Sequence, residues 1–421
     1  MESPLENCLM LLPGRKTGFG DIVVDGDTIA DIRLRPQEGP CSTLVLPGLV
    51  NCHCHAPMTL VRGLGGGLPL QRWLEEAIFP VEAKMTAEDV HAGAVWGAME
   101  MLAGGTTCVA DMYDFPDATA RAFAEVGMRA NVCRVGLSFV PGRLADCIEF
   151  TRRANGPEAK GSVVADICIH SEYLTDEAFC RELAAANRAL ARPLHVHVSE
   201  TRKEHDECVA RHGKTPVAYL ADTGLLDCGG YAAHCVWCTD DDFRIMADKG
   251  VSLVHNPTSN MKLGSGFARI VRAMELGVNV ALGTDGTASN DNLDMFEEMH
   301  IASLVHKGLA QDPTVLSPWD IIEMATKNGA RALGRDDIGE IAVGKKADFC
   351  VVDMDRPHLL PALDLAGMVV YSMHSGDVAR TIVGGKTAYD RSCVGAEFGG
   401  VDRESAKANL LASVRRLGLL A

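Results

Sequence analysis

Short apolar runs alternate with longer, helix-like stretches through the middle of the chain, from Pro47 to about Asp336. Strands joined by helices predict a parallel sheet, because a parallel connection needs a long crossover. About eight such units over roughly 290 residues predict a closed (β/α)₈ barrel of the TIM type. The predicted strands include Thr107–Asp111, Arg129–Gly136, Ile167–His170, Pro193–Val198, Gly230–His234, Val251–His255 and Asn279–Thr284.

The two ends of the chain show a different pattern, of short strands joined by tight turns. Apolar residues flank Asp25-Gly26-Asp27 near the N-terminus and Gly384-Gly385-Lys386 near the C-terminus. Both patterns are typical of β-hairpins. We expect residues 1–49 and 337–400 to pair into one small β-sandwich domain, residues 50–336 to form the barrel, and residues 401–421 to form a C-terminal surface helix.

Charge and cysteine content narrow the possible partners and compartment. The net charge of −16 argues against nucleic acid and anionic membranes, which both need a basic surface. The 15 cysteines are an odd number spread along the chain, a pattern typical of reduced cytosolic thiols. No stretch approaches the roughly 20 apolar residues that span a bilayer. We expect a cytoplasmic homo-oligomer that acts on a small molecule.

Histidines form two His-x-His pairs at the ends of predicted strands. His53 and His55 follow a short apolar run, and His195 and His197 end the strand from Pro193. Residues two apart share one face of a strand, so both members of a pair can point into the barrel mouth as imidazole ligands. A single pair of this kind is as readily explained by packing as by metal binding.

Three further polar residues occupy equivalent positions. Glu200 follows the second histidine pair, His234 ends another strand, and Asp285 follows the apolar run Val278–Leu282. The carboxyl ends of barrel strands are where active sites of this fold are built. This shared position favours a metal-dependent active site over unrelated packing residues.

These motifs resemble the amidohydrolase superfamily, and within it the deaminases of S-adenosylhomocysteine and methylthioadenosine. The resemblance extends over nearly the whole chain. Its matching stretches are Pro47–Leu60, Glu200-Thr201, His255–Leu263, Gly283–Asn290 and Gly339–Asp348.

The resemblance implies that His53, His55, His197 and Asp285 hold one divalent ion. No lysine matches the carboxylated bridge of the two-metal members, so a single ion is expected. Zinc is the default for three histidines and an aspartate, with iron and manganese as alternatives. His195 lies deeper on the same face as His197 and is expected to pack behind the ligands.

The resemblance also implies the catalytic roles. Asp285 would accept the proton of the hydrolytic water, and Glu200 would protonate the ring nitrogen beside the attacked carbon. His234 would stabilise the charge that develops in the tetrahedral intermediate. Glu200 and Asp285 would therefore also contact the substrate.

Other substrate contacts follow from the same comparison. Glu82 matches the carboxylate that accepts hydrogen bonds from ribose hydroxyls, and Arg134 and His170 match positions that reach the substrate. Asp114 departs from the family, whose members often carry an aromatic residue or histidine there. This departure leaves the preferred substrate open.

A different zinc deaminase signature is imitated but not met. That signature is His-x-Glu followed by Pro-Cys-x-x-Cys. His170-Ser171-Glu172 and the Cys235–Cys238 pair approach it, but His234 stands where the proline should be. We interpret Cys235 and Cys238 as packing thiols of the barrel.

The leading functional hypothesis is hydrolytic deamination at C6 of an adenine nucleoside. One alternative is the same fold acting on another aminated or halogenated heterocycle, such as guanine, a pterin or a triazine. Glu82 distinguishes the two, because only a nucleoside needs ribose recognition. A third hypothesis is a non-catalytic barrel that serves as an assembly partner, which the complete set of ligands and Glu200 disfavours.

Overall fold

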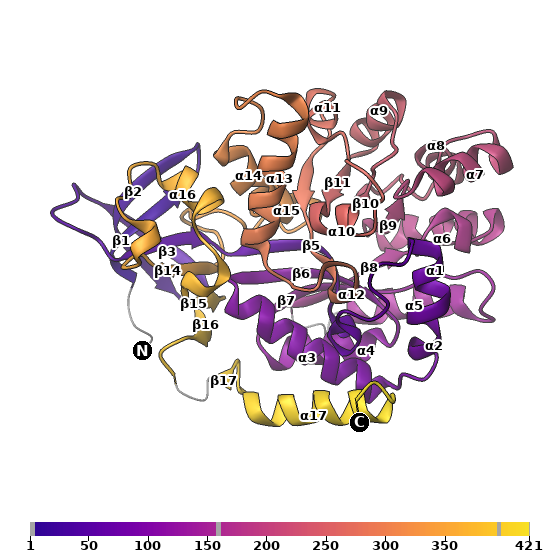
Figure 1. Cartoon of the computed structure of the whole chain (residues 1–421), viewed down its shortest axis with the longest axis horizontal. Helices are drawn as coiled ribbons and strands as arrows, with labels where there is room; N and C mark the ends of the chain where they lie inside the picture. The colour runs from indigo at the N-terminus through magenta and orange to yellow at the C-terminus, as the bar shows by residue number, and fades with distance from the viewer. Residues whose placement is uncertain (1–4, 157–160, 394–396, 421) are drawn as a thin grey trace.

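The computed structural model describes residues 5–156, 161–393 and 397–420. A barrel of parallel strands forms the centre, and a separate sheet lies at one side, built from both ends of the chain (Figure 1). The barrel strands are β5 (Leu49–His55), β6 (Thr106–Tyr113), β7 (Arg129–Arg134), β8 (Val163–Cys168), β9 (Leu194–Val198), β10 (Gly230–His234), β11 (Val251–His255), β12 (Val280–Leu282) and β13 (Asp285–Gly286).

The barrel closes through its first and last strands. Every pair from β5 to β12 is parallel, and β13 pairs in parallel with β5 through Asp285 and Cys54. β12 and β13 together form the last strand of the barrel, which is interrupted at Gly283 and Thr284. All residues of β9, β10 and β11 are buried, as expected for strands covered on both faces. The predicted barrel is confirmed.

Helices surround the barrel and follow most of its strands. The main helices are α3 (Ala87–Ala103), α4 (Pro116–Glu125), α5 (Arg143–Ala154), α6 (Glu177–Leu190), α7 (Arg202–His212), α8 (Pro216–Thr223), α9 (Asp240–Lys249), α10 (Pro257–Lys262), α11 (Ile270–Glu275), α12 (Thr287–Asn290), α13 (Met295–Ala310), α14 (Pro318–Met324), α15 (Lys327–Ala332) and α16 (Leu365–Tyr371). Short helical turns after β5 are η1 (Ala56–Val61), α1 (Leu70–Trp73), η2 (Leu74–Ile78) and α2 (Phe79–Glu82). Further single turns are η3 (Glu172–Leu174), η4 (Pro357–Leu359) and η5 (Ser375–Asp377).

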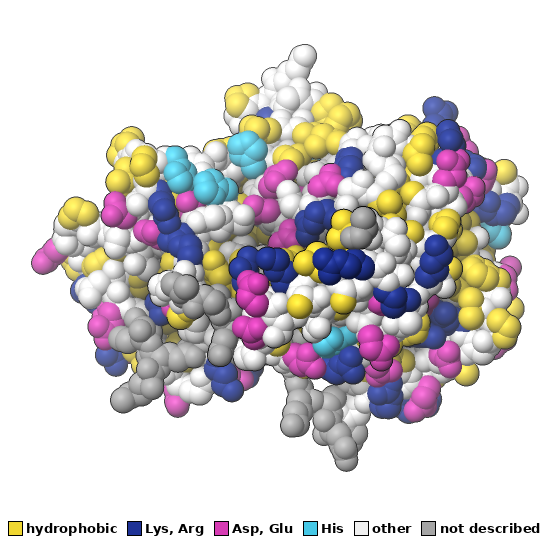
Figure 2. All heavy atoms as spheres, turned by 60° about the horizontal axis from the view of Figure 1, so that its bottom comes forward, with side chains coloured by type: hydrophobic (Ala, Val, Ile, Leu, Met, Phe, Trp, Pro, Cys, Tyr) yellow, Lys and Arg dark blue, Asp and Glu magenta, His cyan; other side chains and the backbone are white. Residues whose placement is uncertain are grey.

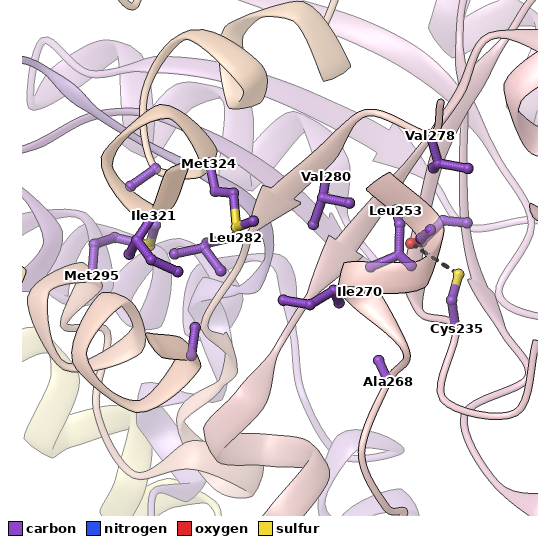
Figure 3. Close-up of a cluster of buried hydrophobic side chains, with 14 of the residues drawn as sticks. Cys235, Leu253, Ala268, Ile270, Val278, Val280, Leu282, Met295, Ile321 and Met324 are labelled. Carbon is purple, nitrogen blue, oxygen red and sulfur yellow. Dashed lines mark hydrogen bonds between the residues drawn. The ribbon is translucent and has the colours of Figure 1, made fainter. Parts of the chain in front are cut away.

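The core lies between the barrel strands and these helices. In Figure 3, apolar side chains of β11 and β12 face those of α11, α13 and α14. The Cys235 thiol packs at the edge of this cluster and donates to the carbonyl oxygen of Ala232 at 3.5 Å. Cys238 is also buried, and both cysteines are free. The pair therefore packs in the barrel wall, as the sequence indicates.

The two ends of the chain join in one seven-stranded sheet. Its strand order is β16-β15-β14-β4-β1-β2-β3, and only the β1–β4 pair is parallel. The predicted hairpins are β2–β3 and β15–β16. The exact domain boundaries stay a prediction. The strands are β1 (Leu5–Leu12), β2 (Lys16–Asp25), β3 (Thr28–Leu34), β4 (Thr43–Pro47), β14 (Phe349–Asp353), β15 (Val378–Val383) and β16 (Lys386–Asp390), and a small pair is formed by β17 (Glu397–Phe398) and β18 (Val401–Asp402).

The C-terminal helix α17 (Arg403–Arg416) runs along the outside of the barrel beside α3 (Figure 1). Leu410 and Leu417 are buried against the barrel, and Arg416 Nε donates to Asp89 Oδ1 of α3 at 3.0 Å. In the view of Figure 2, basic side chains are interspersed with acidic ones. Among the described helices, none has the length and apolar character needed to cross a membrane.

A buried ion pair fastens the terminal sheet to the barrel. Arg129 of β7 donates from Nε to Asp348 Oδ2 at 2.7 Å and from Nη2 to Oδ1 at 3.0 Å. Asp348 Oδ1 also accepts the backbone N–H of Gly384 at 2.7 Å. The two side chains are only 9% and 1% exposed. Each charge is therefore compensated by the other rather than by water.

We expect Asp348→Ala to destabilise the protein by about 3–5 kcal/mol, because it leaves the buried Arg129 charge uncompensated. Replacing both residues, as Arg129→Met with Asp348→Leu, should recover much of this loss. Asp117→Ala is the matched control, since the Asp117–Arg153 pair is exposed and worth about 0–1 kcal/mol. Denaturant unfolding measures all three. A loss in Asp348→Ala no larger than in the control would contradict the expectation.

Candidate active site

A cavity of about 510 Å³ opens at the carboxyl ends of the barrel strands. Most of the predicted site residues line it, namely His55, Glu82, His170, His197, Glu200, His234 and Asp285. His53 lies beneath them and is fully buried. Arg134 is not among the described residues that line the cavity.

Three histidines have their Nδ1 atoms engaged away from the cavity. His55 Nδ1 donates to the carbonyl oxygen of Met112 at 2.5 Å, and His197 Nδ1 donates to that of His170 at 2.8 Å. His53 Nδ1 lies 2.8 Å from Nε2 of His195, which is fully buried behind it. Such outer contacts fix the orientation of a ring and leave Nε2 as the free nitrogen. His195 therefore occupies the packed position behind the candidate ligands that was expected.

Two of the Nε2 atoms face one carboxylate oxygen, and the third lies beside them. Asp285 Oδ1 lies 3.4 Å from His53 Nε2 and 3.2 Å from His55 Nε2. His197 Nε2 lies 3.3 Å from His55 Nε2. His55 and His197 each donate from Nδ1 to a carbonyl oxygen. Their Nε2 atoms therefore present lone pairs to each other unless a cation or a proton lies between them.

One nitrogen of His53 lacks a hydrogen bond, which is evidence on whether these residues fit a metal ion. His53 Nε2 is buried and has no hydrogen-bond partner among the described residues. A buried polar atom without a partner is costly, which a ligand bond would relieve. His53, His55 and Asp285 offer atoms within 4.8 Å of one another, as do His53, His197 and His234. Imidazole and carboxylate donors at this spacing fit one divalent transition-metal ion.

The protonation of His53 and His197 agrees with this fit. Burial lowers the pKa of His53 to about 4 and that of His197 well below its usual value, so both rings are neutral, as metal ligands must be. Burial also acts on His55, but the hydrogen bond and charge of Asp285 outweigh it and raise the pKa of His55 to about 9. The Asp285 carboxylate thus attracts a positive charge to this point.

Asp285 is held on its other side by two serines. Its Oδ2 accepts hydrogen bonds from Ser259 Oγ at 2.6 Å and Ser289 Oγ at 3.0 Å. Its Oδ1 accepts the N–H of Gly286 at 2.8 Å and faces the histidines. Neither serine was predicted to act in the site, although both lie in stretches that match the family.

Glu200 and His234 lie beside this cluster. Glu200 Oε2 is 3.8 Å from His234 Nε2, and Glu200 Oε1 accepts from Ser265 Oγ at 3.2 Å. His234 Nδ1 lies 2.8 Å from Asn260 Oδ1, a contact that turns Nε2 toward the cavity. Burial raises the pKa of Glu200 above its usual value.

Glu204 is a positioning residue that the sequence analysis missed. Its two carboxylate oxygens accept the backbone N–H groups of Ser199 at 2.7 Å and Glu200 at 2.8 Å. It thereby fixes the turn that presents Glu200 to the cavity. The only sequence signal was its position four residues after Glu200, at the start of a helix.

The backbone is strained at the same positions. Ser199, His234, Cys235 and Asp285 all have positive φ, with values of 47°, 72°, 50° and 61°. Non-glycine residues adopt this conformation at a cost, and such residues cluster at functional sites. Three of the four lie just after or at the ends of β9 and β10, where the strands give way to the cavity.

The predicted substrate residues differ in whether they reach the cavity. Glu82 Oε1 accepts from the hydroxyl of Tyr113 at 2.6 Å, which leaves Oε2 for other partners. The ring of His170 packs against that of His197, with 4.5 Å between the two ring centroids. Arg134, by contrast, turns to Asp114, with 3.4 Å between Nη1 and Oδ1. The structure therefore brings Glu82 and His170 to the cavity but not Arg134, whose contact with substrate stays a prediction.

Comparisons with known proteins agree with this architecture. The model of the amidohydrolase family matches residues 44–388, and the chain belongs to this family. A 5-methylthioadenosine/S-adenosylhomocysteine deaminase of Acetivibrio thermocellus is 41% identical over 409 residues, which cover 96% of this chain and 94% of that protein. A 5'-deoxyadenosine deaminase of Methanosarcina mazei is 42% identical over 379 residues, 87% of each chain.

A solved structure extends the comparison to three dimensions. The crystal structure of an adenosine deaminase from Xanthomonas campestris with bound zinc superposes with a TM-score of 0.88. It is 31% identical in sequence and covers 98% of both chains. The barrel and the terminal sheet are therefore arranged as in that deaminase.

Proposed function

We propose that this protein hydrolytically deaminates an adenine nucleoside, giving the inosine analogue and ammonia. One observation carries the proposal: three histidine nitrogens and a carboxylate converge beside Glu200 at the bottom of a cavity that also presents Glu82. The relatives named as deaminases of 5-methylthioadenosine, S-adenosylhomocysteine and 5'-deoxyadenosine support it. A cavity of about 510 Å³ is of the size that takes a small ligand.

His53, His55, His197 and Asp285 would hold the metal ion, with zinc as the proposed ion. When bound, such an ion supplies Lewis-acid chemistry and makes a water molecule a better nucleophile near neutral pH. Zinc is bound to the Xanthomonas campestris enzyme, which supports this choice over iron or manganese. The donor set itself accepts all three ions.

The protein's own residues would move the protons. As water forms its bond to C6 of the purine, Asp285 accepts a water proton and Glu200 donates a proton to the adjacent ring nitrogen. The C6–N bond then breaks: ammonia leaves with the proton that Asp285 received, and Glu200 takes back a proton from the C6 hydroxyl, which becomes the carbonyl oxygen of the product. The raised pKa of Glu200 suits an acid, since it keeps the carboxyl protonated closer to neutral pH.

His234 would stabilise the oxygen that becomes negatively charged as water adds to C6. Its Nδ1 bond to Asn260 fixes the ring, so that no reorientation is needed during the reaction. Asn260 is a positioning residue in this scheme. His170, which lines the cavity beside His197, would contact the purine.

Glu82 would bind the ribose. A carboxylate can accept both vicinal hydroxyl protons in charge-assisted hydrogen bonds. The Tyr113 hydroxyl already occupies Glu82 Oε1 and thereby holds the side chain in one orientation. A bare heterocycle would leave this half-buried carboxylate without its partners, which disfavours the guanine, pterin and triazine alternatives.

We expect adenosine, 5'-deoxyadenosine and methylthioadenosine to be deaminated with similar kcat/KM, and 2'-deoxyadenosine and free adenine to react far more slowly. A site built to bind a hydroxyl rejects a substrate that lacks it. In Glu82→Ala the gap between adenosine and 2'-deoxyadenosine should shrink. Loss of adenine absorbance and release of ammonia measure the reaction.

A matched control for this variant is Glu88→Ala, an exposed glutamate of the neighbouring α3 that does not line the cavity. It should leave the preference for ribose unchanged. If adenine or guanine were the best substrate, the nucleoside proposal would give way to the bare-heterocycle alternative. If no substrate of either kind released ammonia with metal-replete protein, the non-catalytic alternative would hold. The cytoplasmic location and homo-oligomeric state stay predictions.

A further inference from the structure

The rim of the cavity presents a carboxylate in front of two arginines. Asp114 lines the cavity, whereas neither Arg134 nor Arg143 is among the described residues that do so. Asp114 Oδ1 accepts from Arg143 Nη1 at 2.7 Å and lies 3.4 Å from Arg134 Nη1. The guanidinium groups therefore lie behind the carboxylate as seen from the cavity.

Both arginines are committed to contacts within the protein. Arg143 is nearly buried, and its Nη1 also donates to the carbonyl oxygen of Val135 at 2.8 Å. Arg134 Nη2 pairs with Asp146 Oδ2 at 3.5 Å. The group thus contains two guanidinium groups and two carboxylates, so its formal charges cancel. No cation is left over to attract an anionic substrate.

Asp114 occupies the position expected for the 5' end of a nucleoside. His53, His197 and His234 are buried at the bottom of the cavity, whereas Glu82, held by Tyr113, is half-buried. Asp114 follows Tyr113 in the chain, and its side chain is 45% exposed, whereas Tyr113 is buried. A nucleoside with C6 at the bottom and its ribose hydroxyls at Glu82 therefore directs C5' toward this rim.

The remainder of the rim is apolar. Phe115, Phe139 and Tyr173 line the cavity and are all more than a third exposed. Among the described lining residues there is no lysine or arginine. The rim therefore offers hydrophobic contact and one negative charge, whose Oδ2 atom makes no hydrogen bond among those identified in the protein.

On the basis of the proposed function, we infer that Asp114 selects substrates by the charge of their 5' substituent. It admits uncharged groups, such as methylthio, and cationic groups, and it disfavours groups that bear a carboxylate. A carboxylate at the rim would meet the charge of Asp114 without reaching the arginines behind it, and like charges in contact are strongly unfavourable.

The test compares adenosines whose 5'-thio substituents have similar length and different charge: propylthio, 3-aminopropylthio and 2-carboxyethylthio, together with methylthioadenosine and S-adenosylhomocysteine. In the wild-type enzyme kcat/KM for the propylthio and aminopropylthio compounds should exceed that for the carboxyethylthio compound at least about tenfold. S-adenosylhomocysteine, a zwitterion, should fall between them.

Asp114→Asn keeps the shape of the side chain and removes its charge, leaving the group with a net charge of +1. The ratio of carboxyethylthio to propylthio kcat/KM should then rise about tenfold, mainly through KM. Asp117→Asn is the matched control, because Asp117 lies three residues further on, pairs with Arg153 and does not line the cavity. It should leave the ratio unchanged.

Equal rates for the neutral and carboxylate compounds in the wild-type enzyme, or an unchanged ratio in Asp114→Asn, would overturn this inference. Deamination of methylthioadenosine in the same assays would meanwhile leave the proposed function intact, whereas failure to deaminate any of the five compounds would end both. If thermal melting shows that Asp114→Asn does not fold, the salt dependence in the wild-type enzyme decides. Discrimination by an exposed charge should weaken between low and high ionic strength, and discrimination that does not weaken counts against Asp114.

Discussion

Glu200→Gln should lose most of its turnover and keep its metal ion. The substitution preserves the shape of the side chain and its hydrogen bond with Ser265 but removes the proton that Glu200 would donate. A positioned acid–base group contributes roughly 10²–10⁴-fold to the rate, so kcat should fall by that factor. KM should change much less, because Glu200 would contribute chiefly in the transition state.

The controls separate proton transfer from structure. Glu207→Gln makes the same change on the exposed face of α7 and should keep full activity. Glu204→Gln weakens the two backbone contacts that position Glu200 and should lower kcat by a smaller factor than Glu200→Gln does. The smallest expected loss of kcat in Glu200→Gln is about 10²-fold. If the variant retained more than about a tenth of the wild-type rate, this would falsify the assignment of Glu200 as the acid.

The strands of the barrel could be predicted where the apolar pattern is uninterrupted. Gly230–His234 and Val251–His255 were predicted as they are observed. The strand predicted at Ile167–His170 instead begins at Val163 and ends at Cys168. Asp166 interrupts the apolar run, yet it is buried because Arg192 and Tyr231 satisfy its carboxylate at 2.6 and 2.8 Å. Such distant partners leave no local signal.

The last barrel strand differs from its prediction for a reason that lies in the site. The prediction is one strand, Asn279–Thr284, whereas β12 ends at Leu282 and a second short strand, β13, follows at Asp285–Gly286. A Cβ atom on Gly283 would lie 2.9 Å from His53 Cβ, so only glycine allows this part of the chain to approach β5 so closely. Asp285 then adopts a positive φ that directs its carboxylate to the histidines.

The candidate ligands could be predicted from the chain, but their supports could not. Strand alternation and the position at strand ends selected the two histidine pairs, and the resemblance to the amidohydrolases then singled out His53, His55 and His197. The contacts that orient them come from backbone carbonyls and residues far away in the sequence, such as Met112 for His55. The same limit explains Asp114, since its two arginine partners become neighbours only in the folded chain.

The final expectation is that His197→Ala loses the metal ion and the activity together. His197 supplies one of four converging donors, and its alanine variant leaves only three protein ligands with a cavity beside them. After dialysis against metal-free buffer, elemental analysis should find one ion per chain in the wild-type protein. It should find far less than one in His197→Ala treated in the same way. His91→Ala is the matched control, because His91 pairs with Glu125 on the outside of the barrel.

One further cluster must be excluded from the count. His358, His374 and Asp377 lie together away from the cavity, and the two histidines are exposed. Washing with imidazole before analysis should remove ions bound there and leave the buried one, because an exposed site exchanges with solvent. Cobalt added to chelator-treated protein gives a second readout, since its visible spectrum reports ligation without turnover. Two ions in washed protein, full activity without any, or a cobalt spectrum unchanged by His197→Ala would each contradict the single-ion site.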